Sequence, residues 1–139
     1  MTPREKQLVR ESFPAIREAA VPLALLFYGR LFQLNPALRP LFHQDISVQS
    51  RKLMDMLIAV VDSLDHFKEL EPMLRAMGQR HAGYGVRLEH YATLKSALLW
   101  AFGQGLGAEF FPDVRAAWTA VIDAISAAMM AGAAELPPP

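Results

Sequence analysis

The chain has 139 residues, of which 53% are hydrophobic and 20% are charged, so it is long enough to bury one hydrophobic core. Its 14 basic and 14 acidic side chains cancel, which excludes a strong electrostatic attraction to nucleic acid or to an anionic membrane. The absence of cysteine excludes disulfides, thiolate metal sites and cysteine nucleophiles. Residues 1–10 lack the apolar run of a signal peptide, and no uninterrupted apolar stretch reaches about 18 residues, so we expect a cytoplasmic protein without a membrane span.

Apolar residues recur every three or four positions almost everywhere, which predicts helices rather than strands. In the first half of the chain we expect helices over residues 2–20, 22–34 and 47–64, a short helical turn at 36–42 and a loop at 43–47. Thr2 and Glu5 have the spacing of a capping box, and Pro3 suits the first helical position. Asn35-Pro36 marks a turn.

In the second half we expect a connection over residues 65–70 and then helices over 72–83, 89–104 and 112–133. Pro72 is expected to start the first of these helices, and Gly83 is expected to end it. Gly105 and Gly107 are expected to end the second. The sequence therefore predicts an all-α fold, with one domain over residues 1–136 and a proline-rich tail over 137–139.

One of the four histidines is placed differently from the rest. His43 and His66 fall in predicted loops and are typical of solvated side chains. His81 lies four residues after Met77 and seven after Leu74, on a stripe that should face the core. A buried neutral imidazole needs a hydrogen-bond partner or a metal ion, so the pattern allows either a structural histidine or a metal ligand.

Two other polar side chains share helix faces with large apolar groups. Tyr28 lies on the same stripe as Leu25 and Phe32, and Gln49 lies four residues before Leu53. An apolar pocket with a few converging polar groups is typical of a cofactor site. The same spacing also fits a core in which Tyr28 bonds a backbone carbonyl and Gln49 is solvated, so the pattern leaves both interpretations open.

Three groups of motifs occur in order along the chain: FYGRLF at 27–32 with Asn35-Pro36 and LRPLF at 38–42; ISVQSRKLM at 46–54; and GQRH at 78–81 with YGV at 84–86 and His90-Tyr91. The first and third groups resemble bacterial haemoglobins, meaning the single-domain Vitreoscilla-type proteins and the globin domains of flavohaemoglobins. The second group is similar to Hell's Gate globin within the same family. The resemblance extends from about residue 5 to residue 129.

The resemblance implies a globin fold of six to seven helices around one haem b, with His81 as the iron ligand. Tyr28 and Gln49 match the distal pair, whose donors would stabilise negative charge on dioxygen or another diatomic ligand and would act in catalysis in a dioxygenase. The other implied contacts are Phe42, which stacks on the haem; Leu53, an apolar gate; Tyr91, near the proximal imidazole; the apolar walls Leu41, Leu57, Val86 and Leu94; and Arg80 and Lys52 for the propionates.

The chain departs from the family at two places. Flavohaemoglobins carry a glutamate on the last helix that pairs with the proximal tyrosine, whereas the matching position here is Ala133, with Glu135 two residues later. We therefore expect no electron donation from an anionic proximal partner. We also expect no reductase domain, because the 139 residues are filled by the globin domain and the tail.

Three functions remain as hypotheses. The first is oxygen binding, for transport or scavenging. The second is nitric oxide dioxygenation, which removes nitric oxide and depends on electrons from a separate reductase. The third is a haem-free interaction module that uses the Ala/Met-rich stretch 124–134. In each case we expect a monomer or a weak homodimer that binds neither nucleic acid nor membrane.

Overall fold

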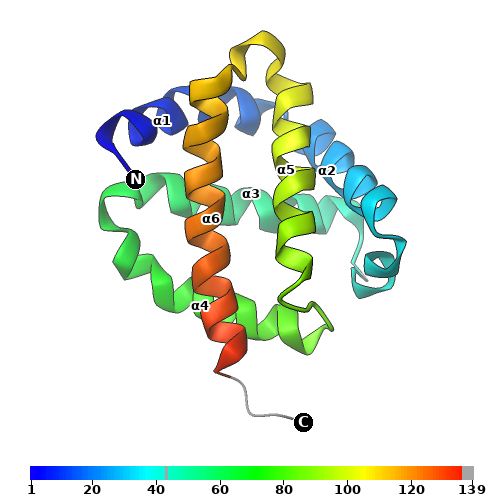
Figure 1. Ribbon diagram of the computed structural model, residues 1–139. Helices are drawn as coiled ribbons and strands as arrows, with labels where there is room; N and C mark the ends of the chain where they lie inside the picture. The colour runs from blue at the N-terminus through cyan, green and yellow to red at the C-terminus, as the bar shows by residue number, and fades with distance from the viewer. Residues whose placement is uncertain (43, 136–139) are drawn as a thin grey trace.

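A computed structural model describes residues 1–42 and 44–135; His43 and residues 136–139, including the expected tail, lie outside the described residues. The described helices are α1 (Pro3–Glu18), α2 (Ala20–Leu34), the 3₁₀ helix η1 (Pro36–Leu41), α3 (Ile46–Asp62), the 3₁₀ helix η2 (Leu64–His66), α4 (Phe67–Gly83), α5 (His90–Leu106), the 3₁₀ helix η3 (Gly107–Glu109) and α6 (Pro112–Ala134). This part of the chain contains no strand, so the predicted all-α class is confirmed. Helices α5 and α6 pack together, α3 crosses behind them, and α4 crosses the C-terminal end of α6 (Figure 1).

The helix boundaries in the first half of the chain follow local chemistry. The Thr2 hydroxyl accepts from the Glu5 amide at 3.1 Å, and the Glu5 carboxylate accepts from the Thr2 amide at 2.8 Å, which confirms the predicted capping box. Helix α2 begins at Ala20, two residues before the predicted start at Pro22. Proline is tolerated there because the first backbone nitrogens of a helix have no intrahelical acceptor. The Asn35 side chain caps η1 and separates it from α2.

The predicted connection over residues 65–70 is wrong. These residues form the end of η2 and the first turn of α4, which begins at Phe67 and contains Pro72 in its interior. Phe67 and Leu70 pack against the core. The burial of these two side chains stabilises the helical turn before Pro72, where the sequence pattern had predicted no helix. This stabilisation outweighs the loss of the one backbone hydrogen bond that the proline cannot donate.

The predicted end of α5 is also displaced. The helix continues past residue 104 to Leu106, and Gly107, with φ of 57°, ends it. Gly105 is therefore inside the helix rather than beyond it. A Cβ atom at Gly105 would overlap the side chain of Leu23, so this glycine allows α2 and α5 to pack closely.

The core is anchored by Trp118, which lies on α6 and has no accessible surface. Its indole N–H donates to the Ser12 hydroxyl at 2.8 Å. Its ring lies 6.2 Å from that of Phe13 and 5.0 Å from that of Phe102, measured between centroids. These contacts join α1, α5 and α6 at the corner near η3 (Figure 1).

Helix α6 is long and apolar enough, by length and composition alone, to cross a membrane. The packing explains that composition, because α6 contacts α1, α4 and α5 and buries Trp118, Val121, Ile122 and Ile125 among them. An apolar helix of this kind is typical of a core element.

Helices α4 and α6 cross at two glycines. A Cβ atom at Gly78 of α4 would overlap the backbone of Met129, and a Cβ atom at Gly132 of α6 would overlap the backbone of Arg75. Each glycine therefore lets the other helix approach to backbone contact. Because Gly78 is one turn before His81, this crossing determines where the last turn of α4 lies.

We predict that Gly78→Ala lowers the free energy of unfolding by about 1–3 kcal/mol, because the added methyl group must push two backbones apart. Urea denaturation followed by circular dichroism measures the change. Gly83→Ala is the matched control: it lies in the same helix with no atom within 4 Å of the added Cβ, so its stability should be unchanged or up to about 1 kcal/mol higher. Equal losses in the two variants would show that the crossing is not tight.

Candidate haem site

His81 lies in the last turn of α4 and is partly buried. Its Nδ1 atom is 2.8 Å from the carbonyl oxygen of Met77. A carbonyl oxygen only accepts, so Nδ1 carries the proton and Nε2 keeps its lone pair. Burial, the largest cause, and the nearby charges of Arg80 and Lys52 hold the pKa of His81 below its usual 6.5, although the hydrogen bond that Nδ1 donates to the Met77 carbonyl acts in the opposite direction. His81 is therefore a neutral imidazole at neutral pH, which is the form that binds iron.

The segment after α4 folds back beside this histidine. Gly85 has a φ of 103°, a left-handed conformation that favours glycine, and it turns the chain after Gly83 ends the helix as predicted. The Val86 amide then donates to the His81 carbonyl at 3.0 Å. Leu41, at the end of η1, lies against Gly85, where an added Cβ atom would come within 3.1 Å of it. The chain thus brings a predicted wall residue from η1 to the loop beside His81.

Aromatic side chains cluster around Tyr28 of α2. The ring centroid of Tyr28 lies 4.8 Å from that of Phe27, 6.2 Å from that of Phe32 and 5.6 Å from that of Phe42. Phe42, at the end of η1, remains partly exposed, whereas Tyr28 is buried. The turn between α2 and η1 therefore brings together Tyr28 and Phe42, two of the predicted site residues.

The Tyr28 phenol keeps its proton over the whole physiological range. Burial raises its pKa to about 12, because a phenolate would lose its hydration in this apolar environment. A protonated phenol donates a hydrogen bond and is a poor metal ligand. Tyr28 is therefore suited to donate to a bound ligand and not to bind iron itself.

Gln49 and Leu53 lie one turn apart on α3, which begins with Asp45 as its cap. Both side chains are partly buried, and no hydrogen bond of the Gln49 amide group is found in the part of the chain that the structure describes. Ser50 is buried beside it, and its hydroxyl reaches the Ala20 carbonyl at 3.5 Å. Gln49 is thus held on a helix that contacts α2, with an amide available to a ligand.

Two cations lie near His81. Arg80 and Lys52, from α4 and α3, both lower its pKa through their charge. Both side chains are exposed, and neither forms an ion pair with a residue in the described ranges. Their placement suits two carboxylates at the solvent edge of a cofactor.

The remaining predicted contacts differ in accessibility. Leu94 is partly exposed, as are Leu41 and Leu53, and could contact a ligand. Leu57 has no accessible surface and is part of the core. Val86 and Tyr91 are buried, and the Tyr91 hydroxyl has no hydrogen-bond partner within the described chain. Burial also raises the pKa of the Tyr91 phenol.

Sequence reasoning missed two features of the site. The Met77 carbonyl orients His81, and the four-residue spacing that placed both side chains on one stripe also brings this carbonyl within reach of the imidazole. The exposed Tyr84 ring lies 6.2 Å from the His81 ring, measured between centroids. No pattern of apolar spacing identified Tyr84, because it belongs to the turn after the helix.

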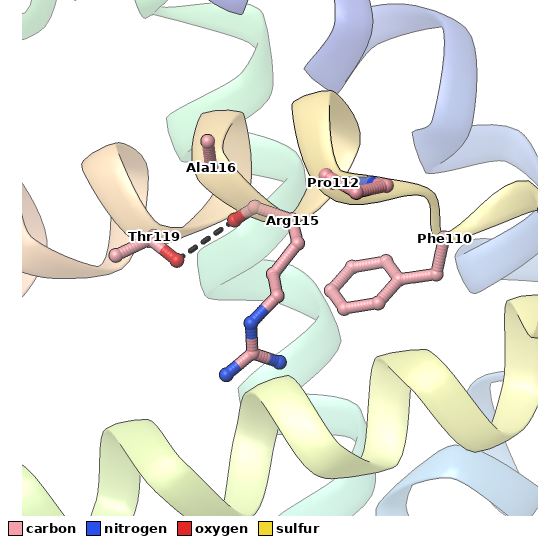
Figure 2. Close-up of a pocket in the computed structure, with 5 residues that line it drawn as sticks. All are labelled: Phe110, Pro112, Arg115, Ala116 and Thr119. Atoms are coloured by element: carbon pink, nitrogen blue, oxygen red, sulfur yellow. Dashed lines mark hydrogen bonds between the residues drawn. The ribbon is translucent and has the colours of Figure 1, made fainter.

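Two surface hollows lie at opposite ends of α6. The first is a shallow apolar depression at its N-terminus, lined by Phe110, Pro112, Arg115, Ala116 and Thr119, where the Thr119 hydroxyl bonds the Arg115 carbonyl at 2.7 Å (Figure 2). It holds none of the predicted site residues. The second, which we call the proximal hollow, is lined by Ala82, Val86, Arg87, Leu88, Ala133 and Ala134 and adjoins the segment around His81.

The donor set fits haem. Among the described residues, no group of three or more histidine or acidic side chains could enclose a metal ion. One imidazole with a free Nε2 atom suits a metal whose remaining ligands come from a macrocycle. Phe42, Leu53 and Leu94 offer partly exposed apolar surface, and Arg80 and Lys52 form no ion pair within the described residues, so the predicted set contains the groups that a flat apolar cofactor with propionates needs.

Comparison with known proteins gives the family. The globin sequence profile matches residues 25–129. Neuroglobin-1 of Oncorhynchus mykiss is 30% identical over 146 residues, covering 95% of this chain and 92% of its own length. Neuroglobin of Chaenocephalus aceratus is 28% identical over 146 residues, with the same shares covered. The chain therefore belongs to the globin family, whose members bind gases through haem.

Solved structures agree. An engineered carbene transferase, derived from a candidate nitric oxide dioxygenase of Rhodothermus marinus, is similar with a TM-score of 0.87 and 28% identity over 97% of this chain and 94% of its own. A bacterial globin from Campylobacter jejuni gives 0.85 at 18% identity, covering 96% and 97%. The flavohaemoglobin of Malassezia yamatoensis, with bound FAD and haem, gives 0.81 at 23% identity over 97% of this chain and 37% of its own. The predicted globin fold is confirmed, whereas a particular likeness to Vitreoscilla-type or Hell's Gate globins stays a prediction.

We predict that Tyr91→Phe leaves the free energy of unfolding unchanged or raises it by up to about 1 kcal/mol, because it removes a buried hydroxyl that has no partner. Thermal and urea denaturation of the haem-free protein measure it. Ser12→Ala is the contrasting control, since it leaves the Trp118 indole N–H without its acceptor and should lose about 1–2 kcal/mol. A loss above about 1 kcal/mol in Tyr91→Phe would show that the hydroxyl is bonded.

Proposed function

We propose that this protein is a haem b globin of the bacterial haemoglobin type that binds dioxygen reversibly, for transport or scavenging in the cytoplasm. The observation that carries the proposal is the hydrogen bond from His81 Nδ1 to the Met77 carbonyl, which leaves Nε2 free on a partly buried, neutral imidazole. The globin family and fold supply the context in which such a histidine holds iron.

When bound, haem would supply an iron atom that binds a diatomic ligand reversibly. Residues of the chain would hold the iron and stabilise the bound ligand. His81 Nε2 would hold the iron, with the ring orientation set by the hydrogen bond to the Met77 carbonyl. The Tyr28 hydroxyl, kept protonated by burial, and the Gln49 amide would donate hydrogen bonds to the ligand. These bonds are stronger in an apolar pocket than in water.

The walls and edges of the pocket exclude water and hold the cofactor. Phe42, Leu41, Leu53 and Leu94 provide accessible apolar surface. Among the other predicted contacts, Val86 and Tyr91 are buried, and Leu57, which has no accessible surface, supports the wall from within the core. Arg80 and Lys52 are proposed to pair with the two propionates, because both are exposed and close to His81.

Nitric oxide dioxygenation is the second proposed function. It is favoured by the similarity, at a TM-score of 0.87 and 28% identity, to a carbene transferase derived from a candidate nitric oxide dioxygenase. Tyr28 and Gln49 would serve both functions, but repeated turnover needs electrons from a separate reductase. Nitrate formation over many turnovers with an added reductase would favour dioxygenase activity, whereas a single reaction per protein would favour oxygen binding.

We predict that the purified protein shows a haem Soret band that shifts reversibly when the reduced protein meets oxygen, and that His81→Ala loses most of its haem. Ultraviolet–visible spectra of the ferric, reduced and oxygen-exposed forms measure this. His66→Ala is the control, because His66 is exposed and lies in η2. No Soret band even after added haem would leave the haem-free interaction module as the function.

We predict that Tyr28→Phe speeds oxygen dissociation about tenfold, which corresponds to loss of one hydrogen bond worth about 1.4 kcal/mol. Stopped-flow displacement of oxygen by carbon monoxide measures the rate. Tyr84→Phe is the matched control, since that ring is exposed on the histidine side. Unchanged dissociation in Tyr28→Phe, with a fast rate in Gln49→Leu, would assign the hydrogen bond to Gln49 instead.

A further inference from the structure

The net charge of zero conceals an uneven distribution of charged side chains. Residues 19–54 and 72–88 carry seven of the 14 basic side chains but only one of the 14 acidic ones, which is Asp45. The carboxylate of Asp45 accepts from the Ser47 hydroxyl at 2.9 Å and caps α3, so it is engaged at its own helix end. The rest of the chain carries the other seven basic side chains and 13 acidic ones. The two segments are therefore strongly basic within a chain that is neutral as a whole.

The fold brings the two basic segments together. Leu41, at the end of η1, lies against Gly85 in the turn after α4. Lys52 of α3 and Arg80 of α4 both lie close enough to His81 to act on it through their charge. In Figure 1, η1, the start of α3 and the turn after α4 lie on the same side of the molecule. Basic side chains that are distant in sequence therefore gather around the histidine that is proposed to hold iron.

Two of the seven basic side chains are engaged by other residues. The guanidinium group of Arg30 lies over the Trp100 ring, 5.1 Å from its centroid, and Arg75 pairs with Glu135. The other five are exposed and form what we call the basic rim: Arg39, Arg51, Lys52, Arg80 and Arg87.

The charges of the basic rim are available to a partner. Among the residues that the structure describes, the rim has one ion pair, between Arg87 and Glu89 at 4.0 Å, and both of these side chains are exposed. An exposed pair at this distance contributes little. Arg80 and Lys52 are proposed to meet the haem propionates, which leaves the positive charge of Arg39 and Arg51 beside that of Arg87.

Two large apolar side chains lie exposed in the segment that carries Arg80 and Arg87. Tyr84 is 55% exposed and Leu88 is 53% exposed, although both belong to the turn beside His81. Exposed tyrosine and leucine side chains rimmed by arginine are typical of a protein–protein interface, where apolar contact gives affinity and the charged rim gives orientation. This surface therefore fits a protein partner better than it fits a small anion.

The charge of the rest of the molecule indicates a compact partner. Outside the basic rim the chain carries nine basic and 14 acidic side chains, so its other faces are acidic on balance. An extended polyanion such as nucleic acid, or the surface of an anionic membrane, would also approach those faces and be repelled. A small acidic protein can contact the basic rim alone.

We infer that the basic rim is the docking surface for a small acidic protein that carries one electron to the haem. This inference rests on the proposed function, in which His81 holds the haem beside the rim. In the step, the reduced centre of the partner loses one electron and the ferric haem gains it, and no bond forms or breaks. Oxygen binding and nitric oxide dioxygenation both need the reduced haem, so the same surface would serve either function.

Binding is tested first, by titration calorimetry of the protein with bound haem. The probe is a plant-type [2Fe–2S] ferredoxin, which is an acidic one-electron carrier, and a basic cytochrome c is the control. We expect the ferredoxin to bind at roughly 0.01 M ionic strength and to bind at least tenfold more weakly at roughly 0.15 M, because the screening length falls from about 30 Å to about 8 Å. The cytochrome c should not bind. Equal binding of the two probes, or ferredoxin binding that does not depend on salt, would overturn the inference.

A matched pair of double variants separates the position of the charge from its amount. Arg51→Glu with Arg87→Glu alters the basic rim. Arg17→Glu with Arg115→Glu removes the same charge from α1 and from the N-terminal end of α6, where both arginines are exposed and form no ion pair within the described residues. None of the four is assigned to the cofactor, so both variants should keep the native Soret band.

The ferredoxin affinity and the second-order rate at which reduced ferredoxin reduces the ferric protein should both be at least tenfold lower for the rim variant than for the control variant. Rim charges act mainly through the association rate, so the difference should shrink at high ionic strength. Equal effects of the two variants would overturn the inference. Tight binding of DNA or anionic vesicles that is lost in the rim variant would also overturn it and assign the rim to a polyanion. Absence of a Soret band in the native protein would instead contradict the proposed function itself.

Discussion

The backbone contact between α4 and α6 is the constraint on which the site depends. Gly78 and Gly132 remove the two Cβ atoms that would keep the helices apart, and each faces the backbone of the other helix. His81 follows Gly78 by one turn, so the crossing positions the imidazole. Its orientation is set separately, within the same helix, by the Met77 carbonyl. The position of the imidazole is set by the packing of two helices, and its orientation is set by a local hydrogen bond. A mutation can therefore disturb one without disturbing the other.

Two groups of the proposed site are chemically opposite. The neutral imidazole of His81 offers a lone pair, and the phenol of Tyr28, held in its protonated form, offers a hydrogen. Burial produces both states, because it disfavours the imidazolium of His81 and the phenolate of Tyr28 alike. One physical cause thus leaves His81 suited to bind a metal and Tyr28 suited to donate a hydrogen bond. The cations of the site, Arg80 and Lys52, remain at the exposed edge.

Features of the fold that depend on neighbouring residues could be predicted from the sequence. The capping box at Thr2, the turn at Asn35 and the end of α4 at Gly83 arise from local chemistry, and the structure has all three. The start of α4 could not be predicted, because Phe67 and Leu70 hold the turn before Pro72 by contacts with distant parts of the chain. For the same reason, the helical placement of Gly105 depends on Leu23 of another helix.

The features of the candidate site also fall into two groups: those that local sequence predicts, and those that depend on contacts between distant parts of the chain. The stripe containing Met77 and His81 indicated a core-facing imidazole, and the structure adds the hydrogen bond that fixes its tautomer. The closeness of Lys52 to His81, the isolation of the Tyr91 hydroxyl and the full burial of Leu57 depend on how helices cross, which periodicity within one helix does not encode. Resemblance supplied those residues as a set, and only the fold distinguishes accessible members from buried ones.

The corner formed by Trp118, Ser12, Phe13 and Phe102 has a consequence for how the protein is made. It joins the first helix to the last two, at the end of α6 away from the crossing with α4 (Figure 1). No side chain assigned to the cofactor takes part in it. The newly synthesised chain can therefore close this corner once its last helix has left the ribosome, and await its prosthetic group as a partly finished protein. In the proposed haem protein, cofactor binding would therefore complete the pocket, whereas this corner packs through protein contacts alone.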